Sequence, residues 1–235
     1  MIHSCCLNKE LKIELFSFLS EEELHLFDTN LYCASYKKGD LIYKFGSPLT
    51  HVVFLTDGYT LVYREATINK KFILSVTKPV NFLSGPGIFY EGINHYSVKA
   101  ISDCKLCFID KNTFLKVFYS NNKFAECFMR EFGFRSVRTM NNFIDITHMN
   151  MEGRIAKLIL FLSNTIYQKD SYDFLISRQD IADYCAITKE SAVRILKSFE
   201  NDNIIKLDNN CIEIIDKKRL EFFVSMYKPK DEVFV

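Results

Sequence analysis

Polar side chains that can hydrogen-bond to nucleic-acid bases gather in one short stretch of the carboxy-terminal part of the chain. Lys189, Glu190, Ser191 and Arg194 all lie there. An arginine can form two hydrogen bonds with guanine, and a glutamate can accept one from the cytosine amino group. This chemistry is usable only if the elements around it hold the group on one exposed helical face.

The surrounding pattern predicts two short helices joined by a tight turn. Ser177 followed by Asp180 is a capping pair for the first helix, and Thr188 caps the second after a turn at Ala186 and Ile187. The apolar residues of the second helix that we expect on or near its buried side are Ala192, Val193, Ile195, Leu196 and Phe199. The polar group is then left at its exposed front, where such a helix can enter the major groove.

Two more features complete the carboxy-terminal motif. Ser177 and Gln179 stand at the start of the first helix, where they can bond phosphates. After Asn203, the runs Ile204–Leu207 and Cys211–Ile215, with a turn between them, predict a β-hairpin wing.

Composition indicates a globular protein of two modest domains. The chain has 235 residues, of which 48% are hydrophobic and 25% charged. We find no long uncharged apolar run, and the first residues carry charges where a signal peptide would be apolar. We therefore expect a cytoplasmic protein with no membrane association, whose eight cysteines are reduced thiols.

The charge balance gives no general argument for nucleic acid. The formal net charge is +1, and from Met151 onward 13 Lys and Arg face 14 Asp and Glu, a balance of −1. Non-specific DNA affinity should therefore be modest. An alternative follows: a protein-binding module whose winged helix contacts another protein.

The first half of the chain predicts a β-sandwich or barrel. Two small helices are expected between Lys9 and Leu31, the second capped at Ser20. From Tyr36 to Ile109, short alternating runs are separated by glycine and proline turns.

A long amphipathic helix is predicted from Thr113 to Thr147. Phe124, Phe128 and Phe132 recur at every fourth position, and an apolar pattern continues through Val137, Met140 and Ile144. A helix of this length has apolar surface to spare, which favours dimerisation over packing on its own domain. A further helical pattern starts at Ile155, so the domain boundary is expected near residues 148–151.

Two segments carry a family resemblance. IADYCAITKESAVRILKSFENDNIIKL resembles the helix-turn-helix and wing of the cAMP receptor protein/FNR (CRP/FNR) family, and KKGDLIYKFGSPLTHVVFLTDGYTLVYRE resembles the opening strands of that family's β-roll. The resemblance implies an α+β fold. Its parts are an amino-terminal cyclic-nucleotide-binding-like β-roll (jelly roll) with short helices over 1–118, a long dimerisation helix over 119–148 and a winged helix-turn-helix over 149–235.

The function implied by the resemblance is sequence-specific transcriptional regulation. We expect a homodimer, paired through a helix of about Asn121 to Thr147, on a near-palindromic site in double-stranded DNA, with RNA polymerase as a partner if the protein is an activator. An enzyme is not expected. A thiol-dependent enzyme using Cys104 or Cys107 would lack a histidine or acidic partner in sequence context.

The resemblance also assigns DNA contacts residue by residue. Base contacts fall to Lys189, Glu190, Ser191 and Arg194, and phosphate contacts to Ser177 and Gln179. Thr188, which caps the recognition helix, is also assigned to the DNA-binding set. Two positions depart from the family pattern. Lys189 stands where many members have arginine, which puts the base preference there in doubt, and Ala186 replaces the usual turn glycine.

The effector is predicted not to be cAMP. Members that bind cyclic nucleotides hold the phosphate with a Glu loop and an Arg-Ser/Thr pair, whereas the matching segment here reads FLSGPGIFYEGINHYSVKA. The chain has no arginine between Arg64 and Arg130, so a buried phosphate in this segment would lack its bidentate partner.

An unknown small molecule or redox signal remains the expected effector. The candidate pocket residues are Phe82, Phe89, Tyr90, His95 and Tyr96, which suit an apolar ligand, a redox group or a filled core, with the filled core as the default.

Bound metal is not expected. Cys5 and Cys6 are adjacent and Cys33 is distant, which does not suit an iron–sulfur cluster. Cys104 and Cys107 have metal-like spacing but lie in a predicted strand, where residues three apart face opposite sides, so we expect one core thiol and one surface thiol. Haem ligation by His51 or His95 stays open as an alternative to ordinary structural histidines.

Overall fold

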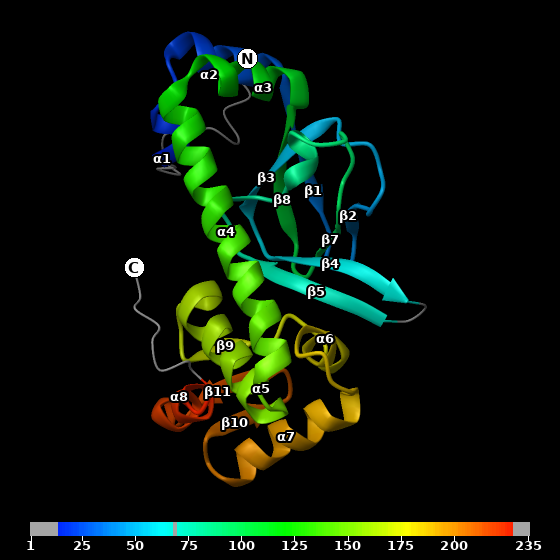
Figure 1. Ribbon diagram of the computed structural model, residues 1–235, viewed down its shortest axis with the longest axis vertical. Coiled ribbons are helices and arrows are strands. Elements are labelled where there is room, and N and C mark those ends of the chain that lie inside the picture. The colour runs from blue at the N-terminus through cyan, green and yellow to red at the C-terminus, as the bar shows by residue number, and fades with distance from the viewer. Residues whose placement is uncertain (1–13, 68–69, 228–235) are drawn as a thin grey trace. The chain divides into compact units, whose positions relative to one another are not determined.

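The computed structural model describes residues 14–67 and 70–227, which form two compact units (Figure 1). The first unit takes the chain up to Arg64 together with Leu74–Arg138. The second takes Glu65–Ile73 and the chain from Thr139 onward. Cys5, Cys6 and the expected helix start near Lys9 lie outside the described residues.

The first unit contains the predicted β-roll, built from two four-stranded antiparallel sheets. In spatial order, one sheet has β1 (Leu31–Tyr36), β8 (Cys104–Asp110), β3 (His51–Asp57) and β6 (Asn81–Phe82). The other has β2 (Leu41–Tyr43), β7 (Ser97–Ala100), β4 (Thr60–Thr67) and β5 (Lys70–Thr77), of which the residues within Glu65–Ile73 belong to the second unit.

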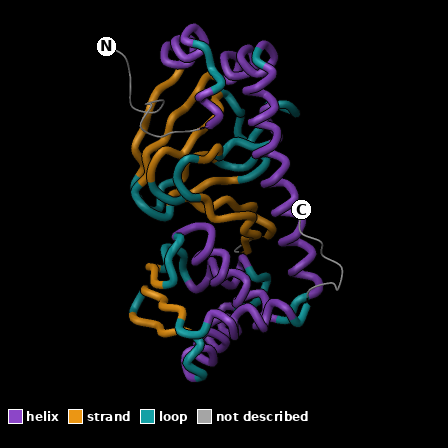
Figure 2. Tube along the Cα trace, turned by 90° about the vertical axis from the view of Figure 1, so that its left-hand side faces the viewer, coloured by secondary structure: helices purple, strands orange, loops and turns teal. Residues whose placement is uncertain are grey.

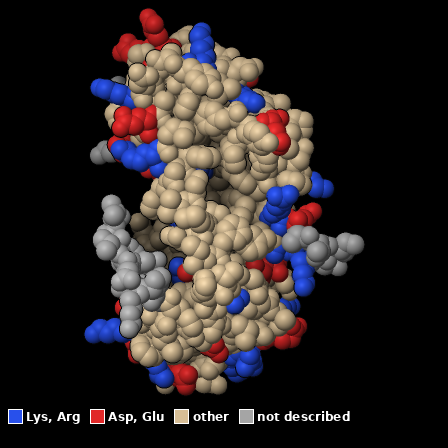
Figure 3. Space-filling view, viewed as in Figure 1, with Lys and Arg blue, Asp and Glu red and all other residues tan. Residues whose placement is uncertain are grey.

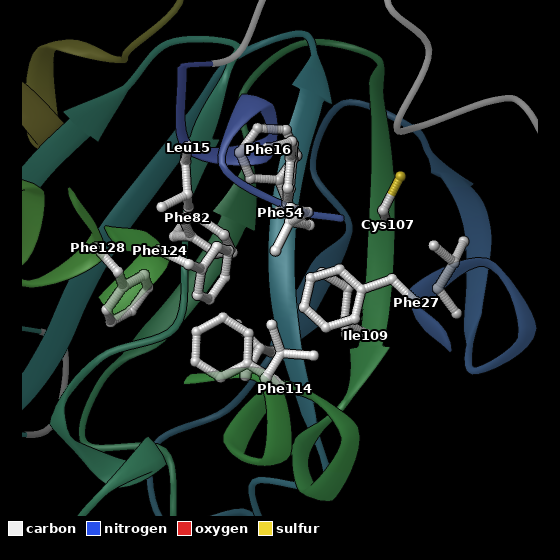
Figure 4. Packing of buried hydrophobic residues seen from close by; sticks show 14 of the residues in the cluster. Leu15, Phe16, Phe27, Phe54, Phe82, Cys107, Ile109, Phe114, Phe124 and Phe128 are labelled. Atoms are coloured by element: carbon white, nitrogen blue, oxygen red, sulfur yellow. The ribbon is translucent and has the colours of Figure 1, made fainter. Parts of the chain in front are cut away.

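Strands β3 and β8 are buried on both sides because their alternate side chains face two different cores. Val53, Leu55 and Phe108 point between the two sheets. Val52, Phe54 and Ile109 point to the other face, which helices cover. Figure 4 shows the rings of this helix-covered cluster gathered beside the strands, with Cys107 at their margin.

The helices of the first unit are α1 (Glu14–Ser17), α2 (Glu21–Thr29), the 3-10 helix η2 (Pro86–Ile88), α3 (Lys111–Ser120) and the first part of α4 (Asn122–His148). Figure 2 shows this unit's strands in orange beside its purple helices. The capping box at Ser20 confirms the predicted start of the second small helix, since Ser20 and Glu23 cap each other's backbone N–H.

The single long helix predicted from Thr113 is wrong in one respect, because the chain breaks at Asn121. This residue has an extended backbone between α3 and α4. Its amide nitrogen donates to the Phe18 carbonyl at 3.0 Å and to Glu23 at 2.9 Å, and its oxygen accepts from the Phe124 N–H at 3.0 Å. Asparagine therefore caps the second helix, a local bond that helical periodicity does not reveal.

The thiols of β8 also differ from expectation. Cys104 and Cys107 do face opposite sides of the strand, but both are buried, at 3% and 1% exposure. No surface thiol results, because the sheet is covered by its partner sheet on one face and by helices on the other.

The second unit has several helices beside a small three-stranded sheet (Figure 2). Its helices, besides the last part of α4, are α5 (Met151–Phe161), the π-helix η3 (Leu162–Tyr167), α6 (Arg178–Tyr184), α7 (Lys189–Asn201) and α8 (Lys217–Ser225). The strands of this small sheet are β9 (Ser171–Asp173), β10 (Ile205–Asp208) and β11 (Cys211–Ile214).

The predicted wing hairpin is confirmed as β10 and β11, which pair from Ile205↔Ile214 to Asp208↔Cys211. Strand β9 adds a third strand beside β11, and α8 follows the wing; neither was predicted. Within 14–67 and 70–227, no helix is long and apolar enough to cross a membrane.

Thiol reactivity in the second unit should differ between two sites. Burial raises the pKa of Cys185 to about 12, whereas Cys211 is only partly buried. At pH 8 the thiolate of Cys185 is then on the order of 1 part in 10,000. We expect iodoacetamide to alkylate Cys211 in the folded protein while Cys185 stays unmodified until denaturant is added. Peptide mass spectrometry measures both sites, and fast labelling of Cys185 in the folded state would contradict this burial.

Candidate nucleic-acid interface

The first helix of the motif, α6, begins at a reciprocal cap. The hydroxyl of Ser177 accepts from the Asp180 N–H at 3.1 Å, and the Asp180 carboxylate accepts from the Ser177 N–H at 3.0 Å and from its hydroxyl at 2.7 Å. Asp180 is buried at 8% exposure, so this cap is fixed in the body of the unit. The predicted helix start is confirmed.

The turn between the two helices depends on an alanine in a strained conformation. Ala186 has φ of 51°, in the left-handed region, which costs a non-glycine residue roughly 1–2 kcal/mol. Arg154 of α5 supports the turn, because its guanidinium donates to the Cys185 carbonyl at 3.0 Å and to the Met149 carbonyl at 2.9 Å. The Ile187 N–H closes the turn on the Ala182 carbonyl at 3.0 Å.

The second helix, α7, begins at Thr188 as predicted. The Thr188 hydroxyl accepts from the Ser191 N–H at 3.2 Å and lies 3.1 Å from the Ser191 hydroxyl. The buried side is formed by Ala192, Ile195, Leu196 and Phe199. Val193, expected on or near that side, is instead 44% exposed, because a helix turns about 100° per residue and carries it away from Ala192.

The exposed side of α7 forms a shallow surface depression, which we call the α7 face. It is lined by Lys189, Glu190, Val193, Arg194, Lys197, Ser198 and Asn201. Three of the four base-contact residues assigned from the sequence are among them, while Ser191 lies at the edge, half-buried beside the cap.

Sequence reasoning missed Lys197, Ser198 and Asn201. Their signal was the helical period, because positions 190, 194, 197 and 201 follow one another at intervals of four, three and four. Extending the face by one turn past Arg194 would have included Lys197 and Ser198, and a second turn would have included Asn201.

The α7 face itself carries a positive charge that favours an anionic partner, but the surface around it does not. Lys189, Arg194 and Lys197 outnumber its one acid, Glu190. On the side of the molecule drawn in Figure 3, Lys and Arg are interspersed with Asp and Glu and do not gather into one basic patch. The preference for an anion therefore rests on this helix and not on the whole unit.

The remaining residues assigned to phosphate contact lie at the start of α6. Ser177 and Gln179 are both exposed, and the Gln179 amide donates to the Asp183 carboxylate at 2.9 Å. Because Ser177 and Asp180 cap each other, the groups left for a phosphate there are the backbone N–H groups of Arg178 and Gln179.

The far end of α7 is held by the wing and α8. The Glu200 carboxylate accepts from the Leu207 N–H at 3.2 Å, and the Phe199 ring lies 5.1 Å from that of Phe223. Arg219 donates to the Asp202 carbonyl at 3.3 Å. The helix is thus braced along its buried side while its opposite face stays open.

The segment predicted to bind an effector is closely packed around two tyrosines. Tyr43 and Tyr96 both donate to the Leu83 carbonyl, at 2.5 and 2.9 Å. Burial raises the pKa of both phenols, so they stay protonated donors. A Cβ at Gly85 would meet the Tyr96 hydroxyl at 2.4 Å and the ring at 2.7 Å, so the backbone at Gly85 lies directly against this side chain.

The other candidate pocket residues do not converge on one space. Phe82 is buried in the helix-covered cluster, and Phe89, 40% exposed, packs on Phe118 with ring centroids 4.8 Å apart. Tyr90 is 63% exposed and stacks on His95, whose Nε2 lies 3.8 Å from Glu91. In the described part of the chain, no group of three or more His, Cys, Asp or Glu is placed to hold a metal ion.

Comparison with known proteins agrees with this geometry. A cyclic nucleotide-binding domain model matches residues 33–121, and a Crp-like helix-turn-helix domain model matches residues 153–223. A CRP-like cAMP-activated global transcriptional regulator of Mycobacterium tuberculosis is 20% identical over 210 residues, covering 88% of this chain and 94% of that protein.

Solved structures show the same fold. The structure of FixK2 from Bradyrhizobium japonicum matches with a TM-score of 0.74 at 18% identity, covering 82% of this chain and 96% of that one. A mutant of CooA from Carboxydothermus hydrogenoformans matches with a TM-score of 0.71 at 15% identity, covering 95% and 98%. The two matched domains, their order along the chain and the helix-turn-helix geometry lead to one conclusion: the chain belongs to the CRP/FNR family of DNA-binding transcriptional regulators.

Proposed function

We propose that this regulator binds DNA as a homodimer and places the α7 faces of its two chains in successive major grooves, about 34 Å apart, on a near-palindromic site. The observation that carries the proposal is the α7 face itself. It presents Arg194 and Glu190 to solvent on one side of a helix whose other side is buried.

Each group on that face has a distinct role in the proposal. Arg194 pairs bidentately with guanine and Glu190 accepts from a cytosine amino group. Lys189 adds a single donor, because an ammonium lacks the planar fork of arginine. Thr188 and Ser191 hold the helix start near the bases, while Lys197 and the first turn of α6, at Ser177 and Gln179, contact phosphates.

The dimer is supported by an apolar stripe on α4. Met129, Val137, Met140 and Ile144 are 47%, 53%, 55% and 47% exposed, although Phe124, Cys127 and Phe128 on the same helix are buried. The exposed set lies on the side of α4 opposite the buried one, at the spacing of a helix-pairing seam. A second copy of α4 presents the same stripe, which makes a two-fold interface self-complementary.

We further propose that the effector is not cAMP. A cyclic nucleotide needs a cation for its phosphate, and the segment between Arg64 and Arg130 contains no arginine. The guanidinium of Arg135 on α4 already donates to the Phe82 carbonyl at 2.5 Å. Because the Tyr96 side chain lies directly against Gly85, the protein's own atoms fill the space beside the loop that contains Gly85.

A protein-contact role for the winged helix is the second candidate, and the near-neutral charge of the carboxy-terminal part is the observation that favours it. It would also fit contact with RNA polymerase if the protein activates transcription. The salt dependence of binding separates the two, because DNA affinity falls steeply as salt rises.

The DNA contacts can be tested by selecting genomic fragments with purified protein and comparing the wild type with Arg194→Ala and Glu190→Ala. We expect the wild type to enrich an inverted repeat. Each variant should lose roughly 1–3 kcal/mol of affinity for it and relax the preference at one base pair per half-site, because each loses one base contact.

Lys218→Ala is the matched control, since it removes one positive charge from exposed α8 without touching the α7 face. It should enrich the same site as the wild type. If no site is enriched with or without oxygen, or if Lys218→Ala loses as much as Arg194→Ala, the assignment of base contacts to α7 is wrong.

The dimer can be tested with Met140→Asp, which places a charge in the centre of the stripe. We expect the dissociation constant of the dimer to rise roughly 100-fold or more, because a buried unpaired carboxylate is costly. Sedimentation equilibrium measures this change. Asn141→Asp, about 100° further round the same helix, is the control and should leave the dimer intact. A wild-type monomer, or equal effects of both variants, would contradict pairing through this stripe.

A further inference from the structure

Two cysteines of the β-roll face each other across neighbouring strands. Cys33 of β1 and Cys107 of β8 are directly opposite in the antiparallel register, and their sulfurs lie 3.4 Å apart. They are 74 positions apart in the sequence, so the pair exists only in the folded chain.

The hydrogen-bond pattern places this pair at a position where strands approach closely. The Asp110 N–H donates to the Asn30 carbonyl at 2.9 Å, which makes Asn30 and Asp110 a hydrogen-bonded pair at the start of the ladder. Antiparallel pairs alternate between hydrogen-bonded and non-hydrogen-bonded, so Cys33 and Cys107, three steps on, are non-hydrogen-bonded.

Such a pair has the spacing that a disulfide needs. Non-hydrogen-bonded partners have Cα atoms about 4.5 Å apart, within the range of about 4.4–6.8 Å found for disulfides. A covalent S–S bond of about 2.05 Å therefore requires the two sulfurs to close a short gap without moving the strands.

The two residues differ in access to solvent. Cys33 is exposed and lies on β1, the edge strand of its sheet, where a small oxidant can reach it. Cys107 is 1% exposed and belongs to the helix-covered cluster shown in Figure 4. This arrangement gives one accessible sulfur and one sheltered sulfur in contact with it.

We propose that Cys33 and Cys107 form a redox-modification site that hydroperoxides convert to a reversible disulfide. The Cys33 thiolate attacks the peroxide oxygen, which gives a sulfenic acid and releases water or an alcohol. The Cys107 sulfur then displaces the hydroxyl as water and forms the S–S bond. Overall, one peroxide takes two electrons and two protons from the two thiols, and a dithiol reductant returns them.

The bond has a physical consequence for the β-roll. It ties edge strand β1 to β8 beside the cluster on which α2 and α3 pack, and it closes a long loop in the unfolded chain. We therefore expect the oxidised protein to melt at a higher temperature than the reduced one.

The test starts from fully reduced full-length protein freed of reductant and titrated with hydrogen peroxide. Remaining thiols are blocked with N-ethylmaleimide, and peptides are mapped by mass spectrometry without reduction. We expect a Cys33–Cys107 linked peptide as the main product, a raised melting temperature, and loss of both after dithiothreitol.

The Cys33→Ser variant should show neither the linked peptide nor the rise in melting temperature. Because its side chain is exposed, this variant should fold normally, whereas Cys107→Ala alters the core.

Cys211→Ser is the matched control, since it removes a thiol from the second unit and should leave the link and the shift unchanged. Three outcomes would overturn the proposal: Cys33 oxidised to sulfinic acid while Cys107 stays a thiol, Cys33 linked mainly to Cys5 or Cys6, or neither sulfur modified by peroxide. None of these readouts depends on DNA, so their failure would leave the proposed function standing.

Discussion

Helix α7 can present a recognition face because its opposite side is firmly buried. Ala192, Ile195, Leu196 and Phe199 are each at most 2% exposed, so rotating the helix about its axis would bring apolar area into water. Burial thereby fixes which residues face outward. The cap at Thr188 fixes where the helix begins, and the Arg154 bonds fix the turn before it. The chemistry of Arg194 and Glu190 is usable only within these constraints.

The β-roll obeys a different constraint, the covering of one sheet on both faces. Strands β3 and β8 are apolar and buried over the continuous runs 52–55 and 106–109, because one set of side chains meets the second sheet and the other meets the phenylalanine-rich cluster under the helices. This two-sided burial makes both thiols of β8 inaccessible. It also leaves Cys33, on the edge strand, as the route by which an oxidant could reach Cys107.

Much of this organisation follows from sequence pattern. Capping residues Ser20, Ser177 and Thr188 marked helix starts correctly, and alternating runs located the strands of the β-roll. Apolar periodicity did not predict where a helix ends when a side-chain hydrogen bond breaks it. It continued through Asn121, although that amide ends one helix and caps the next. Long-range pairing was equally hidden, so the contact of Cys33 with Cys107 and the addition of β9 to the wing emerged only from the fold.

The most direct test of the account is the geometry of the bound site. Two α7 helices related by a two-fold axis require half-sites about one helical turn apart, on the same side of the duplex. Once a site has been selected, affinity can be measured for the same site with about five base pairs inserted between the half-sites, half a turn of DNA. Recognition by two coupled α7 helices predicts that five inserted base pairs abolish specific binding and that about ten partly restore it. Unchanged affinity after insertion of five base pairs would mean that each chain binds DNA independently. Recognition by two coupled α7 helices would then be wrong.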